Sequence, residues 1–448
     1  MHSTLTNGKA TNKRDVLRLA KERNVRFVRL SFVDILGISK NVTVPVTELE
    51  RAIEGKVTFD GGSIDGFVRG EEADMMLLPD LSTFAIHPWT VGGEVEARLI
   101  CNITTPDGEP FEGCPRTTLQ RAIDDGGDAV IGLQSGLEVE FYLFELGPDG
   151  VPTTNSNDVG SYFDITESDR GESVRVDIVT ALESMGVAVA SAHHEHGAGQ
   201  HEVDIKERSL LGTADGLITI RTVAKHIAAR HGLHATFMPK PTEALAGSGV
   251  HVYFSTPQAA GDGPPLEEGE LSEETLFAIG GLLEHAPAFT AICNPTVNSY
   301  KRLVAAWDAP IYTVWSHRSA NSLVRVPSPE DNRARIEVRS ADPTCNPYLA
   351  MAVLLASMAH GIRSHTLPGD ALTGSTYDLN ERERERRRIR TLPKSLRQAL
   401  LELDKDPVVR GALGDHVYHA FRDAKFAEYE RYRRAVHPWE REAYFRVY

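Results

Sequence analysis

Residues 136–144 read Gly136-Leu137-Glu138-Val139-Glu140-Phe141-Tyr142-Leu143-Phe144, and the alternation of polar and apolar side chains predicts an extended strand at the centre of the fold. Successive side chains of a strand point to opposite faces, so Glu138 and Glu140 share one face while the apolar residues between them face a core. Two neighbouring carboxylates repel each other, and burial would raise the pKa of one of them unless a cation lies between them. The alternative interpretation of this single pair is a strand at a solvent edge.

The composition is that of an ordinary globular protein. It has 448 residues, 41% hydrophobic and 25% charged, which suggests a large core and two or more domains. The net charge of −15 argues against a nucleic-acid partner, because neutralising phosphates needs a basic surface. The four cysteines form no C-x-x-C pair, which fits a reducing cytoplasm. No signal core is present, and the longest apolar run, 348–359, is too short to span a membrane.

The chain is expected to divide at residues 106–115 (PDGEPFEGCP), its densest run of turn-forming residues. This places one domain at 1–106 and a second at 107–448. The charged run 381–390 (ERERERRRIR) is expected to be a solvated surface segment, and the remaining C-terminus is expected to be helical to about Arg434. Apolar periodicity predicts helices at 15–23, 116–124, 173–186, 215–231 and 348–359, and strands at 25–32, within 83–103, and at 136–144, 187–192, 250–255 and 335–339.

Four more residues of metal-ligand type follow in the same kind of context. Glu195 and Glu202 flank a loop of small residues in HEHGAGQHE, which would bring them close together. His251 lies in GSGVHVYFS and Glu337 in RIEVR, each on the polar face of an alternating strand. The competing interpretations are a hydrogen-bonded structural histidine and a cross-strand salt-bridge ladder.

Together these residues form an oxygen-rich ligand set: Glu138, Glu140, Glu195, Glu202, His251 and Glu337. Such a set, with one nitrogen and no sulfur, suits Mg²⁺ or Mn²⁺ rather than zinc. Arginines near so much negative charge indicate an anionic substrate or a transferring phosphoryl group. From the residues alone, phosphoryl transfer and binuclear metallohydrolysis remain near equals.

Nearly the whole chain carries, in order, the segments FDGGSIDGFVR, GLEVEFYLF, HHE with GQHEVD, FMPKP, GSGVH, NPTVNSYKRLV, RIEVRSADPTCNPYLA and HPWERE. In these segments and their order the sequence resembles a short-form class I glutamine synthetase. The resemblance implies an α+β fold, with an N-terminal β-grasp-like domain and a catalytic domain built on an antiparallel sheet flanked by helices. It also implies a homo-oligomer, a double hexameric ring with active sites between subunits, that uses ATP, glutamate, ammonia and two or more Mg²⁺ or Mn²⁺ ions.

The resemblance also assigns roles to individual residues. It gives one metal to Glu140, Glu195 and Glu202, and the other to Glu138, His251 and Glu337. It places glutamate against Arg302, Arg339 and Gly247, phosphate against Arg325, and the nucleotide against Tyr253, Ser255, Arg325 and Arg335. It assigns ammonium to Tyr162, Ser63, Asp308 and Asp60, with Asp60 reaching in from the adjacent subunit, and glutamine sensing to Arg69.

The implied reaction has two steps. The γ-carboxylate of glutamate attacks ATP to give an acyl phosphate, and an amine deprotonated by carboxylates such as Asp60 then displaces phosphate. Charge stabilisation carries such a reaction, because phosphoryl transfer leaves little covalent work to the protein. The site must also exclude water, because water would hydrolyse the acyl phosphate before the amine attacks it.

Four positions depart from the family pattern. Asp308 stands where a glutamate is expected, Ala246 where an asparagine is expected, and Gly62 where a serine is expected. Ala320 replaces a phosphate-stabilising arginine. If this segment is a strand, Arg318 lies on the same face, roughly 7 Å away, and we expect it to reach the γ-phosphate instead.

These departures leave two competitors to glutamine formation. One is a γ-glutamyl ligase that uses an organic amine such as methylamine, ethanolamine or a polyamine, for which Asp308 and Gly62 would make room. The other is a regulatory paralogue with little catalysis, which the retained acidic residues argue against. Tyr377 is expected to be a plain surface residue.

Overall fold

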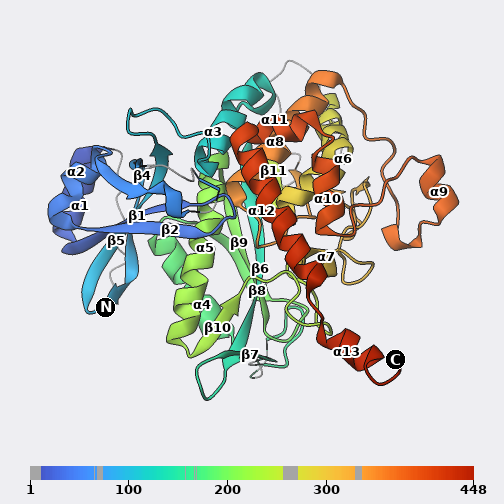
Figure 1. Ribbon diagram of the computed structural model, residues 1–448, viewed down its shortest axis with the longest axis horizontal. Helices are drawn as coiled ribbons and strands as arrows, with labels where there is room; N and C mark the ends of the chain where they lie inside the picture. The colour runs from blue at the N-terminus through green and yellow to red at the C-terminus, as the bar shows by residue number, and fades with distance from the viewer. Residues whose placement is uncertain are drawn as a thin grey trace.

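In the computed structural model the chain folds into two β-sheets, each covered by helices (Figure 1). The expected α+β class, with a β-grasp domain ahead of a larger domain, is confirmed. The structure describes residues 12–64, 66–67, 74–156, 158–165, 167, 169–255, 271–327 and 335–448.

The N-terminal domain is a five-stranded sheet in the order β2-β1-β5-β4-β3. The central strands β1 and β5 run parallel and the other pairs run antiparallel. Helix α1 begins where the Asn12 side chain accepts the Asp15 backbone N–H, and it buries Val16 and Leu19. The elements are α1 (Lys13–Glu22), β1 (Val25–Val33), β2 (Ser39–Pro45), η1 (Val46–Glu48), α2 (Leu49–Ile53), β3 (Val57–Asp60), η2 (Gly61–Ser63), β4 (Asp74–Val91) and β5 (Glu94–Thr104).

The second domain contains a nine-stranded sheet in the order β12-β13-β14-β11-β6-β9-β8, with β10 and β7 also paired to β6. All its pairs are antiparallel except β12 with β13. Its strands are β6 (Gln134–Leu146), β7 (Pro152–Ser156), β8 (Val189–His194), β9 (Gln200–Ser209), β10 (Leu233–Thr236), β11 (Val250–Ser255), β12 (Trp315–Ser316), β13 (Val324–Arg325) and β14 (Arg335–Val338).

Helices cover the sheet and extend to the C-terminus (Figure 1). They are α3 (Pro115–Gly126), η3 (Gly127–Val130), α4 (Glu172–Ser184), α5 (Leu210–Arg230), α6 (Glu273–Cys293), α7 (Ser299–Arg302), α8 (Pro347–Ser364), η4 (Thr376–Asp378), α9 (Glu381–Arg386), α10 (Leu396–Leu403), α11 (Pro407–Leu413), α12 (Asp415–Arg434) and α13 (Pro438–Tyr444).

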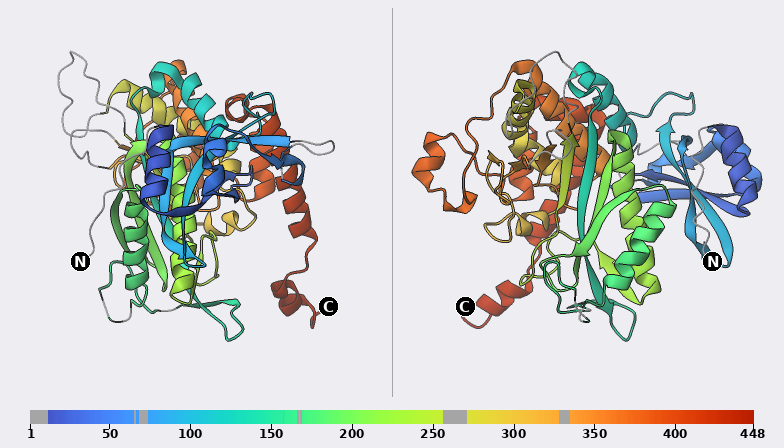
Figure 2. Two further views of the ribbon diagram at one scale, coloured as in Figure 1. Left: turned by 90° about the vertical axis from the view of Figure 1, so that its left-hand side faces the viewer. Right: turned by 180° about the vertical axis from the view of Figure 1, so that it is seen from behind.

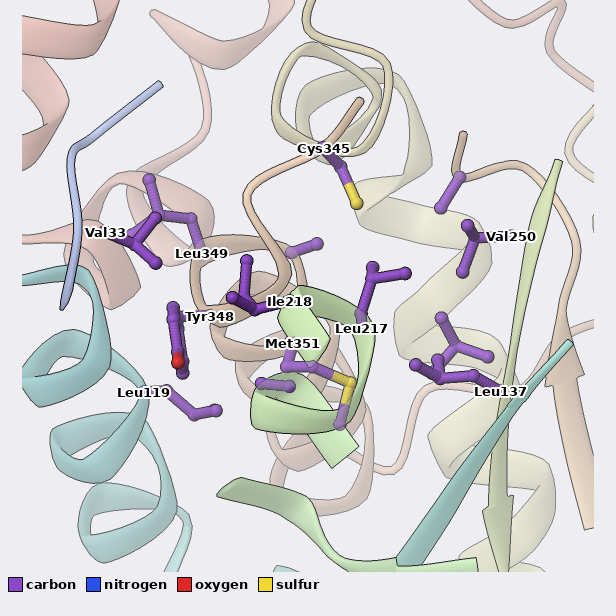
Figure 3. Packing of buried hydrophobic residues seen from close by; sticks show 14 of the residues in the cluster. Val33, Leu119, Leu137, Leu217, Ile218, Val250, Cys345, Tyr348, Leu349 and Met351 are labelled. Carbon is purple, nitrogen blue, oxygen red and sulfur yellow. The ribbon is translucent and has the colours of Figure 1, made fainter. Parts of the chain in front are cut away.

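One hydrophobic cluster runs through both domains. Figure 3 shows Val33 of β1 near one end of a part of it and Leu137 of β6 near the other, with Ile218 and Leu217 of α5 between them. Burying this much apolar surface is the main favourable term in folding. The two sheets are therefore held together by a shared core rather than by a flexible linker.

Helices α6 and α8 cross at glycines. A Cβ atom on Gly281 would lie 2.1 Å from the Ser357 carbonyl, and one on Gly361 would lie 2.2 Å from the Phe277 carbonyl. Among the described residues, α6 is the one helix long and apolar enough to cross a membrane by length and composition, but 83% of that window is buried inside the protein. The core helix of a globular domain has this character.

The predicted elements agree with the structure apart from their ends. Strand β4 begins at Asp74, earlier than expected, and the C-terminus continues past Arg434 into α13, which projects from the body (Figure 2). Helix α9 buries none of its residues, as expected of the charged run.

Candidate active site

Strand β6 presents Glu138 and Glu140 on one face of the large sheet, as the alternation predicts. Both are partly buried, whereas Val139 between them is fully buried on the reverse face. Backbone register places His251 of β11 opposite Glu138 and Glu202 of β9 opposite Glu140. The sheet therefore carries a continuous row of metal-ligand-type side chains.

The first group in this row contains Glu138, His251 and Glu337, whose ligand atoms lie within 4.8 Å of one another. His251 Nδ1 lies 2.7 Å from Glu138 Oε2 and 3.6 Å from Glu337 Oε1. The family resemblance implies that these three residues share one metal, and the structure brings them together. Their role as ligands remains a prediction.

The second group is His193, Glu195 and Glu202, which differs from the expected trio in one member. His193 takes the place expected for Glu140, and its Nε2 lies 3.0 Å from Glu202 Oε1. Glu140 instead accepts hydrogen bonds from Gln200 Nε2 (3.1 Å) and from the Gly249 backbone N–H (3.0 Å). It still lines the same cavity.

A third group, Glu138, Glu202 and Asp204, joins the other two. Sequence analysis missed Asp204 and His193. For Asp204 the signal was present, because it follows Glu202 by two residues on β9 and so shares its face. His193 lies near the end of β8, which stops before Glu195, and it meets Glu202 only through the register between β8 and β9.

The carboxylates of the row crowd one another. Burial, followed by the charges of Glu140 and Glu138, raises the pKa of Glu202 well above its usual value. Burial and the charge of Glu140 likewise raise the pKa of Glu195. Burial opposes ionisation of Glu138 too, but hydrogen bonds from His251 and Tyr253 lower its pKa to about 2. Such mutual repulsion is what a bound cation would relieve, so the donor set fits divalent metal ions.

Arginines border the row on the β14 side. The carboxylate of Glu337 has no solvent exposure and forms ion pairs with both Arg325 and Arg339. Arg302 is buried, and its guanidinium donates to the backbone carbonyls of Ser340 (2.9 Å) and Arg339 (3.1 Å). Arg302, Arg325 and Arg339 all line the cavity, where they suit an anionic substrate.

The Gly-Ser-Gly segment lies directly against Arg302. A Cβ atom on Gly249 would come within 2.4 Å of the Arg302 guanidinium, and one on Gly247 within 2.8 Å of the Arg302 stem and of the Pro239 carbonyl. Only glycine permits this approach without displacing its neighbours. Ala246, which replaces the expected asparagine, is buried and also lines the cavity.

Two loops, around Tyr162 and around Asp308, also line the cavity. Tyr162 stacks on His196, with ring centroids 4.4 Å apart and 14° between the planes. Trp307 and Asp308 both have left-handed backbone, at φ 52° and 56°, which is uncommon for residues other than glycine. Tyr377 is half-buried rather than a plain surface residue, because its hydroxyl donates to the Ala309 carbonyl (2.8 Å) and so holds this loop.

These side chains surround one cavity of 740 Å³, a volume typical of small-molecule sites. The residues of the expected site that line it are Glu138, Glu140, Tyr162, Glu195, Glu202, Gly247, His251, Arg302, Asp308, Arg325 and Arg339. Glu337 lies just beneath this lining, bonded to Arg325 and Arg339.

Three predicted nucleotide-contacting residues do not line the cavity. The Tyr253 hydroxyl donates to Glu138, and the Ser255 hydroxyl donates to Glu207. Arg335 Nε lies 2.9 Å from Glu207 Oε1. Glu207 of β9 was missed from the sequence, because it reaches Ser255 of β11 and Arg335 of β14 past the intervening strands of the sheet.

Asp60 and Ser63 lie in the β-grasp domain and do not line the cavity of their own chain. Both are exposed, and Asp60 accepts the Ser63 hydroxyl (2.9 Å) and the Gly62 backbone N–H (2.8 Å). Arg69 lies outside the described residues.

The strand geometry assumed for Arg318 is wrong. Strand β12 ends at Ser316, and the chain then turns, with the Ser319 N–H donating to Ser316 Oγ (2.7 Å) and the Ser322 N–H to the Ser319 carbonyl (3.4 Å). Arg318 is exposed on this turn and does not line the cavity, whereas Ala320 does. The two residues therefore do not share a strand face.

A β-grasp domain joined to a large antiparallel sheet, with carboxylate groups and arginines facing one cavity, defines a two-domain enzyme suited to divalent cations and an anionic substrate. The model of the glutamine synthetase β-grasp domain matches residues 24–106, and that of the glutamine synthetase catalytic domain matches residues 112–444. The chain belongs to the glutamine synthetase family.

Curated relatives share this family over nearly their whole length. A glutamine synthetase of Thermus thermophilus is 46% identical over 446 residues, covering 97% of this chain and 99% of that protein. A glutamine synthetase of Staphylococcus aureus is 44% identical over 440 residues, covering 97% of this chain and 98% of that protein.

Solved structures share the fold. A structure described as a GmaS/ADP complex superposes with a TM-score of 0.85 at 30% identity, covering 98% of this chain and 100% of that one. The Plasmodium falciparum glutamine synthetase superposes with a TM-score of 0.84 at 22% identity, covering 98% of this chain and 100% of that one.

Proposed function

We propose that this protein is an ATP-dependent glutamate–ammonia ligase, which forms glutamine, ADP and phosphate by way of γ-glutamyl phosphate. The observation that carries the proposal is that buried carboxylates and arginines drawn from separate strands meet in one cavity. Homology to proteins named glutamine synthetase supports the same reaction.

In this proposal two ligand groups hold Mg²⁺ or Mn²⁺. Glu138, His251 and Glu337 hold one ion, and Glu140, Glu195 and Glu202 the other, with His193 and Asp204 beside them. When bound, these ions neutralise negative charge on the phosphates and on glutamate. Oxygen-rich ligands favour these cations over softer ones.

The arginines orient the anionic substrates. Arg302 and Arg339 bind the α-carboxylate of glutamate beside Gly247, whose backbone lies directly against Arg302. Arg325 contacts the transferring phosphate, and Tyr253, Ser255 and Arg335 lie toward the nucleotide. Attack by the γ-carboxylate oxygen on the terminal phosphorus of ATP releases ADP and leaves the acyl phosphate.

The second step needs a free amine. Tyr162 and Asp308, which line the cavity, receive ammonium, and Asp60 and Ser63 of an adjacent subunit complete this pocket. A carboxylate takes one proton from ammonium, ammonia attacks the acyl carbon, and phosphate leaves. This arrangement requires a homo-oligomer, for which we propose the double hexameric ring, and the four buried, unpaired cysteines are consistent with a cytoplasmic location.

The test is phosphate release from ATP by the purified protein with Mg²⁺ and glutamate, with glutamine measured in the same samples. Ammonia should support both products at equal rates. Methylamine, ethanolamine and a polyamine are assayed in parallel, because Asp308 is shorter than the expected glutamate. Turnover with an organic amine but not with ammonia would contradict the proposal. The absence of phosphate release with ammonia and with every amine would contradict it too.

A further inference from the structure

A second large cavity, of 980 Å³, lies between the two domains. Strands β1, β4 and β5 of the β-grasp sheet form one wall and helix α5 of the catalytic domain forms the other, which places it where the blue strands meet the green helix in Figure 1. It shares no lining residue with the carboxylate-lined cavity. It is therefore a separate site.

Positive charge gathers in this cavity, although the whole chain carries a net charge of −15. Two of its cations are neutralised locally, Arg29 by Glu96 (2.8 Å) and Lys40 by Asp34 (3.4 Å). The lining also contains Arg98, Arg221 and Lys225, for which the described part of the chain offers no carboxylate within 4.0 Å.

The single lining carboxylate does not balance them. Glu428 lies 2.8 Å from Lys425 of its own helix and is engaged there. The cavity thus has an excess of positive charge contributed by both domains, and such concave surfaces concentrate anions.

Among the positively charged residues of this cavity, Arg98 is the residue best placed to bind an anion. It is 8% exposed, its Nε is buried without a hydrogen-bond partner, and no hydrogen bond joins its guanidinium to a described residue. A buried arginine normally has a carboxylate or several carbonyls around it, because an uncompensated charge in the interior is unfavourable. The charge of Asp215 acts on Arg98, but no ion pair or hydrogen bond with a described residue occupies its guanidinium. Arg98 lines the cavity and therefore has unused capacity to bind an oxyanion there.

Two neighbouring residues, His87 and Arg221, are also affected by the excess of positive charge in this cavity. Burial, followed by the charges of Arg98, Arg29 and His226, lowers the pKa of His87 to about 3, so its imidazole is neutral at physiological pH. Arg221 is 9% exposed and donates to the carbonyls of Gly37 (3.5 Å) and Cys345 (2.5 Å), but its Nε has no partner.

The walls are also suited to a small organic molecule. Trp89 stacks on His226 across the domain junction, with ring centroids 4.0 Å apart and 22° between the planes. Phe32 and Phe237 add apolar surface from β1 and from the segment after β10. A cavity of this size with apolar walls and a few convergent polar groups is the usual form of a metabolite site.

We propose that this inter-domain cavity binds a small anionic metabolite whose carboxylate or phosphate group pairs with Arg98. Arginine recognises both groups through two parallel N–H···O hydrogen bonds. Because the two walls belong to different domains, the ligand joins the β-grasp domain to the catalytic domain. It binds the native protein and not the unfolded chain, so it raises the melting temperature.

The test uses the full-length protein with two probes, inorganic phosphate and succinate. Each is titrated at constant ionic strength while the melting temperature and tryptophan fluorescence are followed. At least one probe should give a saturable change in both signals, and the tighter one identifies the oxyanion. The fluorescence change should disappear in Trp89→Phe, because Trp89 lies in this wall and not in the catalytic cavity.

Variants of Arg98 decide the assignment. Arg98→Met keeps the apolar stem and should weaken binding at least ten-fold, whereas Arg98→Lys keeps the charge and should bind with intermediate affinity. Arg18→Met, a change at an exposed arginine paired with Glu22, should match the wild type. Unchanged affinity in Arg98→Met, or no saturable binding of either probe to the wild type, would overturn the proposal. If Arg98→Met does not fold, two other results together would overturn the proposal. They are an Arg98→Lys variant that binds the probe with wild-type affinity, and a Trp89→Phe variant that keeps the full fluorescence change.

Discussion

At the scale of single residues, the phenol of Tyr377 shows how a group outside the cavity controls one inside it. Its hydroxyl donates to the Ala309 carbonyl, 2.8 Å away, and also lies 3.3 Å from the Ala306 carbonyl. Burial, and then the charge of Asp308, raises the pKa of Tyr377 to about 12, so the hydroxyl keeps its proton. The loop that carries Asp308 is therefore anchored by one side chain.

We expect Tyr377→Phe to lower kcat/KM for ammonia about five-fold, because the hydrogen bond it removes contributes about 1 kcal/mol. The melting temperature should change little. The measurement is steady-state kinetics with ammonia varied, and Tyr429→Phe, a change on α12 away from the loop, is the matched control. An unchanged kcat/KM would show that the hydroxyl does not position Asp308.

The same scale shows what alternation in the sequence can predict. It correctly placed Glu138, Glu140 and His251 on one face, because facing depends on the parity of positions along a strand. It did not find His193, because the pairing of His193 with Glu202 depends on the register between β8 and β9. The strand geometry expected around Arg318 was wrong because the hydroxyl side chains of Ser316 and Ser322 stabilise a turn.

At the scale of elements, Arg116 joins three parts of the chain. From the start of α3 its guanidinium makes a two-point contact with Asp215 of α5 (3.1 and 3.0 Å), and it also contacts Asp80 of β4 (2.7 Å). Tyr348 of α8 donates to the same Asp215 carboxylate (2.7 Å). The two domains are therefore joined by a buried ionic network as well as by apolar packing.

Arg116→Met should lower the free energy of unfolding by about 3–5 kcal/mol, because it leaves a buried carboxylate without its counter-charge. Denaturant titration measures the change. Arg18→Met, at an exposed ion pair on α1, should leave the unfolding curve within experimental error. A similar effect of both substitutions would show that the network does not stabilise the domain junction.

The pH dependence of stability should report the same contact. Burial opposes ionisation of Asp80, but hydrogen bonds from Ser82 and Arg116 hold its pKa below the ordinary 3.8. A carboxylate whose pKa is lower in the folded than in the unfolded protein stabilises the folded state. This stabilisation is fully present at a pH above the unfolded pKa, and it is lost as the pH falls through the folded pKa. The stability difference between the wild type and Asp80→Asn should therefore shrink below about pH 4. A difference that stays constant from pH 6 to pH 3 would contradict this.

Elements were easier to predict than their ends. Amphipathic stretches such as α1 were found because packing of an apolar face repeats every turn. Strand β4 was predicted too short because its edge pairing with β3, from Asp74 to Leu77 opposite Asp60 to Val57, involves residues distant in sequence. The short α13 was missed because a helix of one or two turns has too little periodicity to detect.

At the scale of the whole molecule, Asp60 lies in the β-grasp domain, does not line its own chain's cavity and is exposed. If it serves the cavity of an adjacent subunit, Asp60→Asn and Glu337→Gln should each be inactive alone. Co-assembled in equal amounts they should recover about a quarter of wild-type activity, because random mixing leaves that share of sites intact.

The control for this experiment is a mixture of Glu138→Gln with Glu337→Gln. Both positions belong to the same ligand group of one chain, so mixing cannot assemble an intact site. A mixture of Asp60→Asn and Glu337→Gln that stays as inactive as its parents would show that Asp60 does not act between subunits.

The carboxylate cavity as a binding site for two divalent ions is the claim on which the proposed chemistry depends. Its most direct test is the number of Mn²⁺ ions bound per chain, measured from the free-ion electron paramagnetic resonance signal. The wild type and Glu145→Gln, a change at an exposed position of the same strand, should bind about two ions. Glu337→Gln should bind one ion with at least ten-fold lower affinity. A wild type that binds no Mn²⁺, or a Glu337→Gln variant that binds as the wild type does, would contradict the account.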